Sequence, residues 1–165
     1  MYNNFKNMSI VLGNLGVADL PKSLEFGGNK FVVKPEFHIT LLNFERIAKL
    51  IDSANVEKLK PDILSEFYEF VNKQPLTQYT LSKELRLVRA GENKTIVVLA
   101  KLKGIDKLFD TLSKKYGVAL PVQPTHITLY TLPTDTFGIP INSYEELKKI
   151  SKLVDLPELQ TLLAQ

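Results

Sequence analysis

The sequence contains the same four residues twice, His38-Ile39-Thr40-Leu41 and His126-Ile127-Thr128-Leu129, about half the chain apart. These two histidines are the only ones in the chain. In a β-strand, residues i and i+2 project to the same face. Each histidine therefore shares a face with the threonine two positions later, and the isoleucine and leucine share the opposite face. The repeat predicts two similar strands, each polar on one side and apolar on the other.

The polar residues of this H-x-T motif are suited to chemistry on phosphodiesters. If the two strands lie close together around a pseudo-two-fold axis, they build one site with two imidazoles and two hydroxyls. A neutral imidazole can take a proton from water while an imidazolium donates one to the leaving oxygen, and both forms are accessible near the ordinary histidine pKa of about 6.5. The threonine hydroxyls can donate hydrogen bonds to non-bridging phosphate oxygens.

We therefore predict that His38 and His126 are the catalytic acid and base, in either order, and that Thr40 and Thr128 bind phosphate. Tyr130 lies two positions after Thr128 and is expected to face the same cleft, where it either stacks on a base or packs in the core. We interpret four further basic residues as solvated surface charges that are candidate phosphate neighbours only: Lys34, Arg86, Arg89 and Lys101.

A metal site is the main alternative interpretation of the two histidines. The chain has no cysteine and neither motif contains a carboxylate, so the motifs fall short of the three protein ligands that a catalytic zinc ion needs. We expect no metal and no cofactor. The absence of cysteine also excludes disulfides and suits a reducing compartment.

The composition of the chain indicates the general class of protein. The chain has 165 residues, of which 44% are hydrophobic and 24% charged, as in an ordinary globular domain. A net charge of +3 permits an anionic ligand. The apolar stretch Ser9–Leu12 is too short for a signal peptide and fits a first strand, and no apolar run reaches the ~20 residues needed to span a bilayer. We expect a single cytoplasmic domain over residues 1–165 that does not enter a membrane.

Hydrophobic spacing predicts an α+β order of elements. Strands are expected at Met8–Leu12, Lys30–Val33, Glu36–Asn43, Thr77–Leu81, Leu85–Ala90, Lys94–Leu102 and Thr125–Leu132. Helices are expected from Phe44 to Ile51, over Pro61–Lys73, over Ile105–Tyr116 with Gly117 as its terminator, from the capping box at Ser143 through Leu153, and from Pro157 onward. No glycine-rich nucleotide-binding loop is present.

Two H-x-T motifs in an α+β chain of this size resemble the two-histidine (2H) phosphoesterase superfamily, which includes 2′-5′ RNA ligase-like proteins and 2′,3′-cyclic nucleotide phosphodiesterases. The resemblance implies a bilobal, pseudo-two-fold fold in which two antiparallel sheets flank a central cleft, with helices outside and one motif in each lobe. It also implies a metal-independent phosphodiesterase, and it assigns no role to the segment after Ser143.

The expected activity is hydrolysis of a 2′,3′-cyclic phosphate or a 2′-5′ phosphodiester of RNA or a nucleotide. The expected partner is an RNA end or a small cyclic nucleotide, and the expected oligomeric state is a monomer. Two alternatives stay open: degradation of cyclic oligonucleotide second messengers, and a non-catalytic relative that binds RNA or a nucleotide. A purely structural protein would leave the repeated tetrapeptide unexplained.

Overall fold

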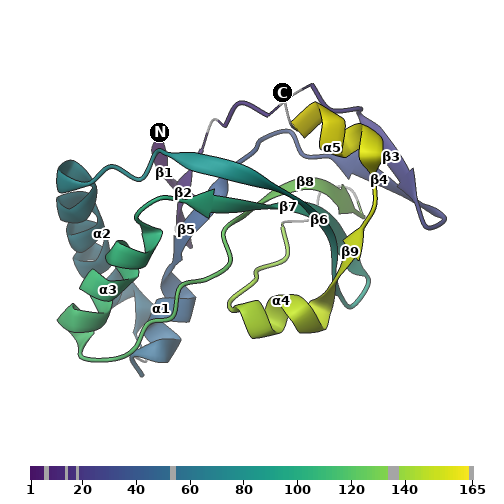
Figure 1. The fold of residues 1–165 in the computed structure, drawn as a ribbon. Helices are drawn as coiled ribbons and strands as arrows, with labels where there is room; N and C mark the ends of the chain where they lie inside the picture. The colour runs from purple at the N-terminus through teal and green to yellow at the C-terminus, as the bar shows by residue number, and fades with distance from the viewer. Residues whose placement is uncertain (6–7, 14, 18, 53–54, 134–137, 164–165) are drawn as a thin grey trace. The chain divides into compact units, whose positions relative to one another are not determined.

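The computed structural model describes residues 1–5, 8–13, 15–17, 19–52, 55–133 and 138–163. Within these residues the α+β prediction is confirmed, with five helices and nine strands (Figure 1). The strands are β1 (Tyr2–Phe5), β2 (Ser9–Leu12), β3 (Ser23–Phe26), β4 (Asn29–Val33), β5 (Ile39–Asn43), β6 (Tyr79–Ala90), β7 (Asn93–Leu102), β8 (His126–Leu132) and β9 (Ser151–Val154). The helices are α1 (Phe44–Leu50), α2 (Val56–Lys73), α3 (Ile105–Tyr116), α4 (Tyr144–Ile150) and α5 (Pro157–Leu163).

The described strands pair in one antiparallel sheet, where the resemblance implied two sheets. Hydrogen-bonded neighbours follow the order β1-β2-β5-β8-β7-β6-β9, and β4 pairs with both β3 and β8. β5 and β8, which hold most of the two H-x-T motifs, are therefore direct neighbours.

The chain divides into two compact units, and each takes segments from both halves of the sequence. Unit 1 consists of residues 1–12, 40–79 and 102–122, and unit 2 of residues 13–39, 80–101 and 123–165. Unit 1 contains α1, α2 and α3, and unit 2 contains α4 and α5. None of the helices built from described residues is long and apolar enough to cross a membrane.

In unit 1 the second helix begins earlier in the sequence than predicted. α2 begins at Val56, five residues before the expected position, because the side chain of Asn55 accepts a hydrogen bond from the Lys58 N–H at 3.1 Å and caps the first turn. Asparagine is among the preferred N-cap residues. Pro61 consequently lies inside the helix rather than at its start, where its ring nitrogen cannot donate the usual backbone hydrogen bond.

The helices of unit 1 bury large apolar side chains. Phe67 of α2 is fully buried and contacts the ring of Tyr2 edge to face, with centroids 5.2 Å apart. α3 ends as predicted at Gly117, which adopts the left-handed conformation with φ 66° that glycine allows at helix ends. On the surface, Lys115 of α3 forms ion pairs with Asp62 and Glu66 of α2, at 2.7 and 2.6 Å.

Unit 2 differs from the predicted order at β3, which was not predicted, at β6 and after α4. β6 is one strand of twelve residues where two were expected. The predicted helix through Leu153 was wrong at its end, because α4 stops at Ile150 and the next four residues form β9, which pairs with β6. The predicted N-cap at Ser143 is confirmed, because its Oγ accepts from the Glu146 N–H at 3.0 Å. The reciprocal bond differs from that of a capping box, since the Glu146 carboxylate accepts at 2.6 Å from the N–H of Asn142, the residue before the N-cap.

The segment after Ser143 thus has a structural role in unit 2. Leu147 of α4 belongs to a buried apolar cluster that includes residues of β6, β7 and the stretch before α4. The members of this cluster are Val88, Val97, Ile139, Ile141 and Leu147. Through this cluster, α4 and residues 139–141 pack against the face of the sheet to which the Val97 side chain points.

Candidate functional site

The two H-x-T motifs meet at their central isoleucines. Ile39 of β5 lies directly opposite Ile127 of β8 in an antiparallel pair, and both side chains are fully buried. Residues opposite each other in such a pair project to the same face. The two isoleucines therefore point to one side of the sheet, and the residues that flank them point to the other.

A continuation of this register by one residue beyond β5 would place His38 opposite Thr128. His38 stands just before β5, one residue outside the observed strand, and His126 is the first residue of β8. The two histidines are then diagonal neighbours, for which Cα atoms lie about 7–8 Å apart. His38, His126 and Thr128 all belong to unit 2 and are all partly exposed, so this part of the predicted set lies together on one face.

The ring of His126 is fixed by the backbone that precedes it. Its Nδ1 lies 3.0 Å from the carbonyl oxygen of Pro124. A carbonyl can only accept, so Nδ1 bears the proton and Nε2 of the neutral ring has a free lone pair. Thr125 secures this segment to β7, because its Oγ1 donates to the Ala100 carbonyl at 2.5 Å and its carbonyl accepts from the Ala100 N–H at 2.9 Å.

Both imidazoles favour the neutral form more than a free histidine does. Burial lowers the pKa of His38, the charge of Lys34 lowers it further, and Glu36 opposes the shift. Burial also lowers the pKa of His126, the hydrogen bond to the Pro124 carbonyl opposes this, and a charge on His38 lowers the pKa further.

Thr128 presents a hydroxyl without a protein partner. It lies opposite Val97 of β7, its side chain is partly exposed, and within the described part of the chain its hydroxyl makes no hydrogen bond. Thr40, the other predicted phosphate-binding residue, is partly exposed and lies in the portion of β5 that belongs to unit 1.

Tyr130 does not share the face of Thr128, because a β-bulge intervenes. Thr128 pairs with Val97 and Tyr130 with Ile96, so Leu129 is an extra residue on β8. Adjacent residues of β7 point to opposite faces, and the bulge thus turns Tyr130 to the other side of the sheet. Its side chain is fully buried, and its hydroxyl donates to the Pro21 carbonyl at 3.1 Å. Of the two roles considered for Tyr130, the structure favours core packing.

The same bulge brings a residue that the sequence did not indicate to the histidine face. Thr131 pairs with Thr95 of β7, and Thr95 projects to the same side as Val97. Both threonines are buried, and the hydroxyl of Thr95 has no hydrogen-bond partner. Only the register of β7 and β8 reveals this row of threonines.

The structure describes the surroundings of the four basic residues interpreted as surface charges. The guanidinium of Arg86 donates to the hydroxyl of Ser151 at 2.8 Å, and Arg89 and Lys101 are exposed. The charge of Lys34 lowers the pKa of His38. The described residues contain no group of three or more histidine, cysteine, aspartate or glutamate side chains that could hold a metal ion.

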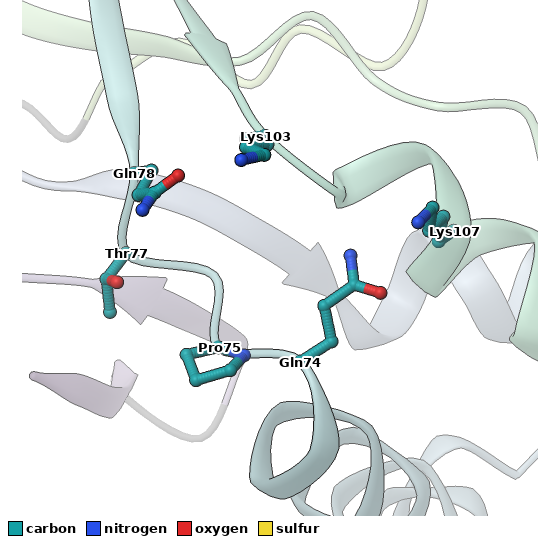
Figure 2. Close-up of a pocket in the computed structure, with 6 residues that line it drawn as sticks. All are labelled: Gln74, Pro75, Thr77, Gln78, Lys103 and Lys107. Carbon is teal, nitrogen blue, oxygen red and sulfur yellow. The ribbon is translucent and has the colours of Figure 1, made fainter.

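A separate hollow of about 410 Å³ lies in unit 1, near the start of α3. Figure 2 shows the carboxamide of Gln74 reaching toward the segments that bear Lys103 and Lys107. The hollow is lined by Gln74, Pro75, Thr77, Gln78, Lys103 and Lys107. Neither histidine lines it, so it is no part of the site described above.

Comparisons of the chain with protein-family models, with curated proteins and with solved structures found no match.

Proposed function

We propose that this protein is a metal-independent phosphodiesterase that hydrolyses a 2′,3′-cyclic phosphate or a 2′-5′ phosphodiester of RNA or a nucleotide. The observation that supports it best is the antiparallel pairing of Ile39 with Ile127, because its register favours a common face of unit 2 for His38, His126 and the Thr128 hydroxyl. Two imidazoles and a hydroxyl donor are the groups that general acid–base hydrolysis of a phosphodiester requires.

His126 acts as the general base in this proposal. Its Nδ1–H is held by the Pro124 carbonyl, which leaves Nε2 to accept a proton from the attacking water. Repulsion between two protonated imidazoles means that the pair binds one proton more readily than two, and in this proposal that proton resides on His38, because Nε2 of His126 must be unprotonated to act as the base. The base is thus neutral while the acid is charged.

His38 acts as the general acid. The water oxygen forms a new bond to phosphorus, the bond from phosphorus to one ribose oxygen breaks, and His38 gives its proton to that oxygen. His126 ends the step protonated and His38 neutral, and the product is a phosphomonoester. Proton exchange with solvent restores the starting state.

Thr128 donates a hydrogen bond to a non-bridging oxygen, on which negative charge increases toward the transition state. For Thr40 the same role follows from the motif alone. The proposal also includes the finer features of the 2H resemblance: a pseudo-two-fold, bilobal arrangement, a monomer, a location in the cytoplasm, and an RNA end or cyclic nucleotide as substrate.

A product assay tests the proposal directly. The protein is incubated with 2′,3′-cyclic AMP, a 2′-5′-linked oligoadenylate and a cyclic dinucleotide, each with and without excess EDTA, and products are separated by chromatography. We expect turnover of the cyclic phosphate or the 2′-5′ linkage at the same rate in EDTA. Loss of turnover in EDTA would contradict the acid–base scheme, and turnover of the cyclic dinucleotide alone would redirect it to second-messenger degradation.

The pH profile provides a second prediction. The active form has one neutral and one protonated histidine, so the rate falls at low pH as the base becomes protonated and at high pH as the acid loses its proton. Because the pKa values of both histidines are lowered, we expect a bell-shaped profile of kcat/KM with its maximum below the ordinary histidine pKa of about 6.5.

The control for this profile is an unfolding experiment at each pH. A lowered pKa in the folded state means that the unfolded chain binds more protons, so the contribution of these histidines to stability decreases as pH falls below about 6.5. Assays are restricted to pH values at which the protein stays folded. A maximum above pH 7 in the folded range would contradict the expected pKa shifts.

A further inference from the structure

The backbone of Gly138 lies close to the hydroxyl of Thr128. A Cβ atom built on Gly138 would lie 2.8 Å from Oγ1 of Thr128, 3.6 Å from its Cβ and 3.9 Å from its Cγ2. The first distance is shorter than real Cβ contacts. Any residue other than glycine at this position therefore competes with the hydroxyl for the same space.

Crowding distinguishes Gly138 from a second glycine of the same unit. Gly16, also in unit 2, has no positive φ and has nothing within 4 Å of its built Cβ. The lack of space for a Cβ at position 138 comes from the Thr128 side chain.

The backbone at Gly138 is held in place by the residues that follow it. Ile139 and Ile141 are 6% and 3% exposed and belong to the apolar cluster with Val97, and Val97 is the β7 residue opposite Thr128. Moving Gly138 away from Thr128 would pull Ile139 out of this cluster. A Cβ at position 138 would therefore displace the threonine side chain rather than the backbone.

We infer that Gly138 is a positioning residue that holds the Thr128 hydroxyl in the orientation used for phosphate. A threonine side chain occupies a few staggered χ1 positions, and a Cβ at position 138 makes the observed one unfavourable. Rotation about χ1 then moves the hydroxyl elsewhere. The inference rests on the proposed function, because it assigns the hydroxyl a phosphate to bind.

The kinetic test is a double-mutant cycle with the substrate that the wild type turns over. Thr128→Val removes the hydroxyl, and we expect kcat to fall on the order of 10²-fold, the scale for loss of one such donor. Gly138→Ala should lower kcat by a similar factor. The double variant should fall no further, because the hydroxyl that Gly138 positions is already gone. Gly16→Ala is the matched control and should retain wild-type kcat.

Two further measurements separate positioning from a general structural effect. Thermal melting of each variant establishes that it is folded under assay conditions. In Gly138→Ala combined with Thr128→Ser, the smaller serine can turn its hydroxyl past the new methyl group, so we expect partial recovery of kcat. Losses that multiply in the Gly138→Ala/Thr128→Val variant would overturn the inference.

The side-chain angle is read without any substrate. Three-bond NMR couplings to the Thr128 methyl carbon report χ1, and we expect them to change in Gly138→Ala and to be unchanged in Gly16→Ala. An unchanged χ1, or a changed χ1 with wild-type kcat, would overturn the inference. If the wild type turns over none of the probes, the proposed function fails, and the couplings still decide whether Gly138 holds the hydroxyl.

Discussion

Replacing either histidine with alanine is expected to lower kcat by 10²–10⁴-fold, the usual contribution of general acid–base catalysis. His126→Ala removes the group whose Nδ1 is oriented by the Pro124 carbonyl, and His38→Ala removes the charge that lowers the pKa of His126. The measurement is the steady-state rate with the substrate identified by the product assay. Circular dichroism of both variants serves as the control for folding.

A substrate with a different leaving group distinguishes the general acid from the general base. A phosphodiester that releases 4-nitrophenolate needs little help from an acid, because this leaving group is a stable anion. We expect His38→Ala to recover much of its lost rate with such a substrate and His126→Ala to recover none. The reverse pattern would exchange acid and base, and wild-type activity of both alanine variants would contradict the two-histidine scheme.

The second large effect is expected on the free energy of unfolding, when Ile127 at the pairing of the two motifs is replaced. Ile127 is fully buried and lies opposite both Ile39 and Val98. Replacing it with alanine should lower the free energy of unfolding by about 2–5 kcal/mol, and replacing it with valine by about 0.5–1.5 kcal/mol, because the lost methyl groups leave a cavity. Urea denaturation at a pH above 7 measures both changes.

A matched control is available on the same unit. Leu153 of β9 is 60% exposed, so Leu153→Ala should change the free energy of unfolding by no more than about 0.5 kcal/mol. A loss below about 0.5 kcal/mol for Ile127→Ala would show that the isoleucine pair does not support the sheet here.

The sequence was informative where the pattern is local. Alternation within each tetrapeptide correctly predicted that Ile39 and Ile127 are buried while the neighbouring histidines and threonines are partly exposed. Helices at 105–116 and from Ser143 were also predicted, because a spaced apolar stripe, a terminal glycine and an N-cap serine are all determined by residues a few positions apart.

Sequence reasoning failed where a distant segment decides the local structure. Ser151–Val154 continues a helical pattern but forms a strand, because β6 offers it a hydrogen-bonding edge. Tyr130 was expected beside Thr128, and the bulge at Leu129 turns it into the core. β1 and β3 were not predicted, since short strands of mixed polarity are recognised only by their partners.

Local sequence was sufficient to predict two similar polar faces, each with an imidazole and a hydroxyl, because side-chain alternation follows from the covalent geometry of an extended chain. Three further features required the folded chain: the pairing of Ile39 with Ile127, the orientation of one imidazole by Pro124, and the position of Gly138 beside the hydroxyl of Thr128. Register, bulges and close backbone approaches depend on contacts between residues far apart in the chain, and no local pattern specifies them.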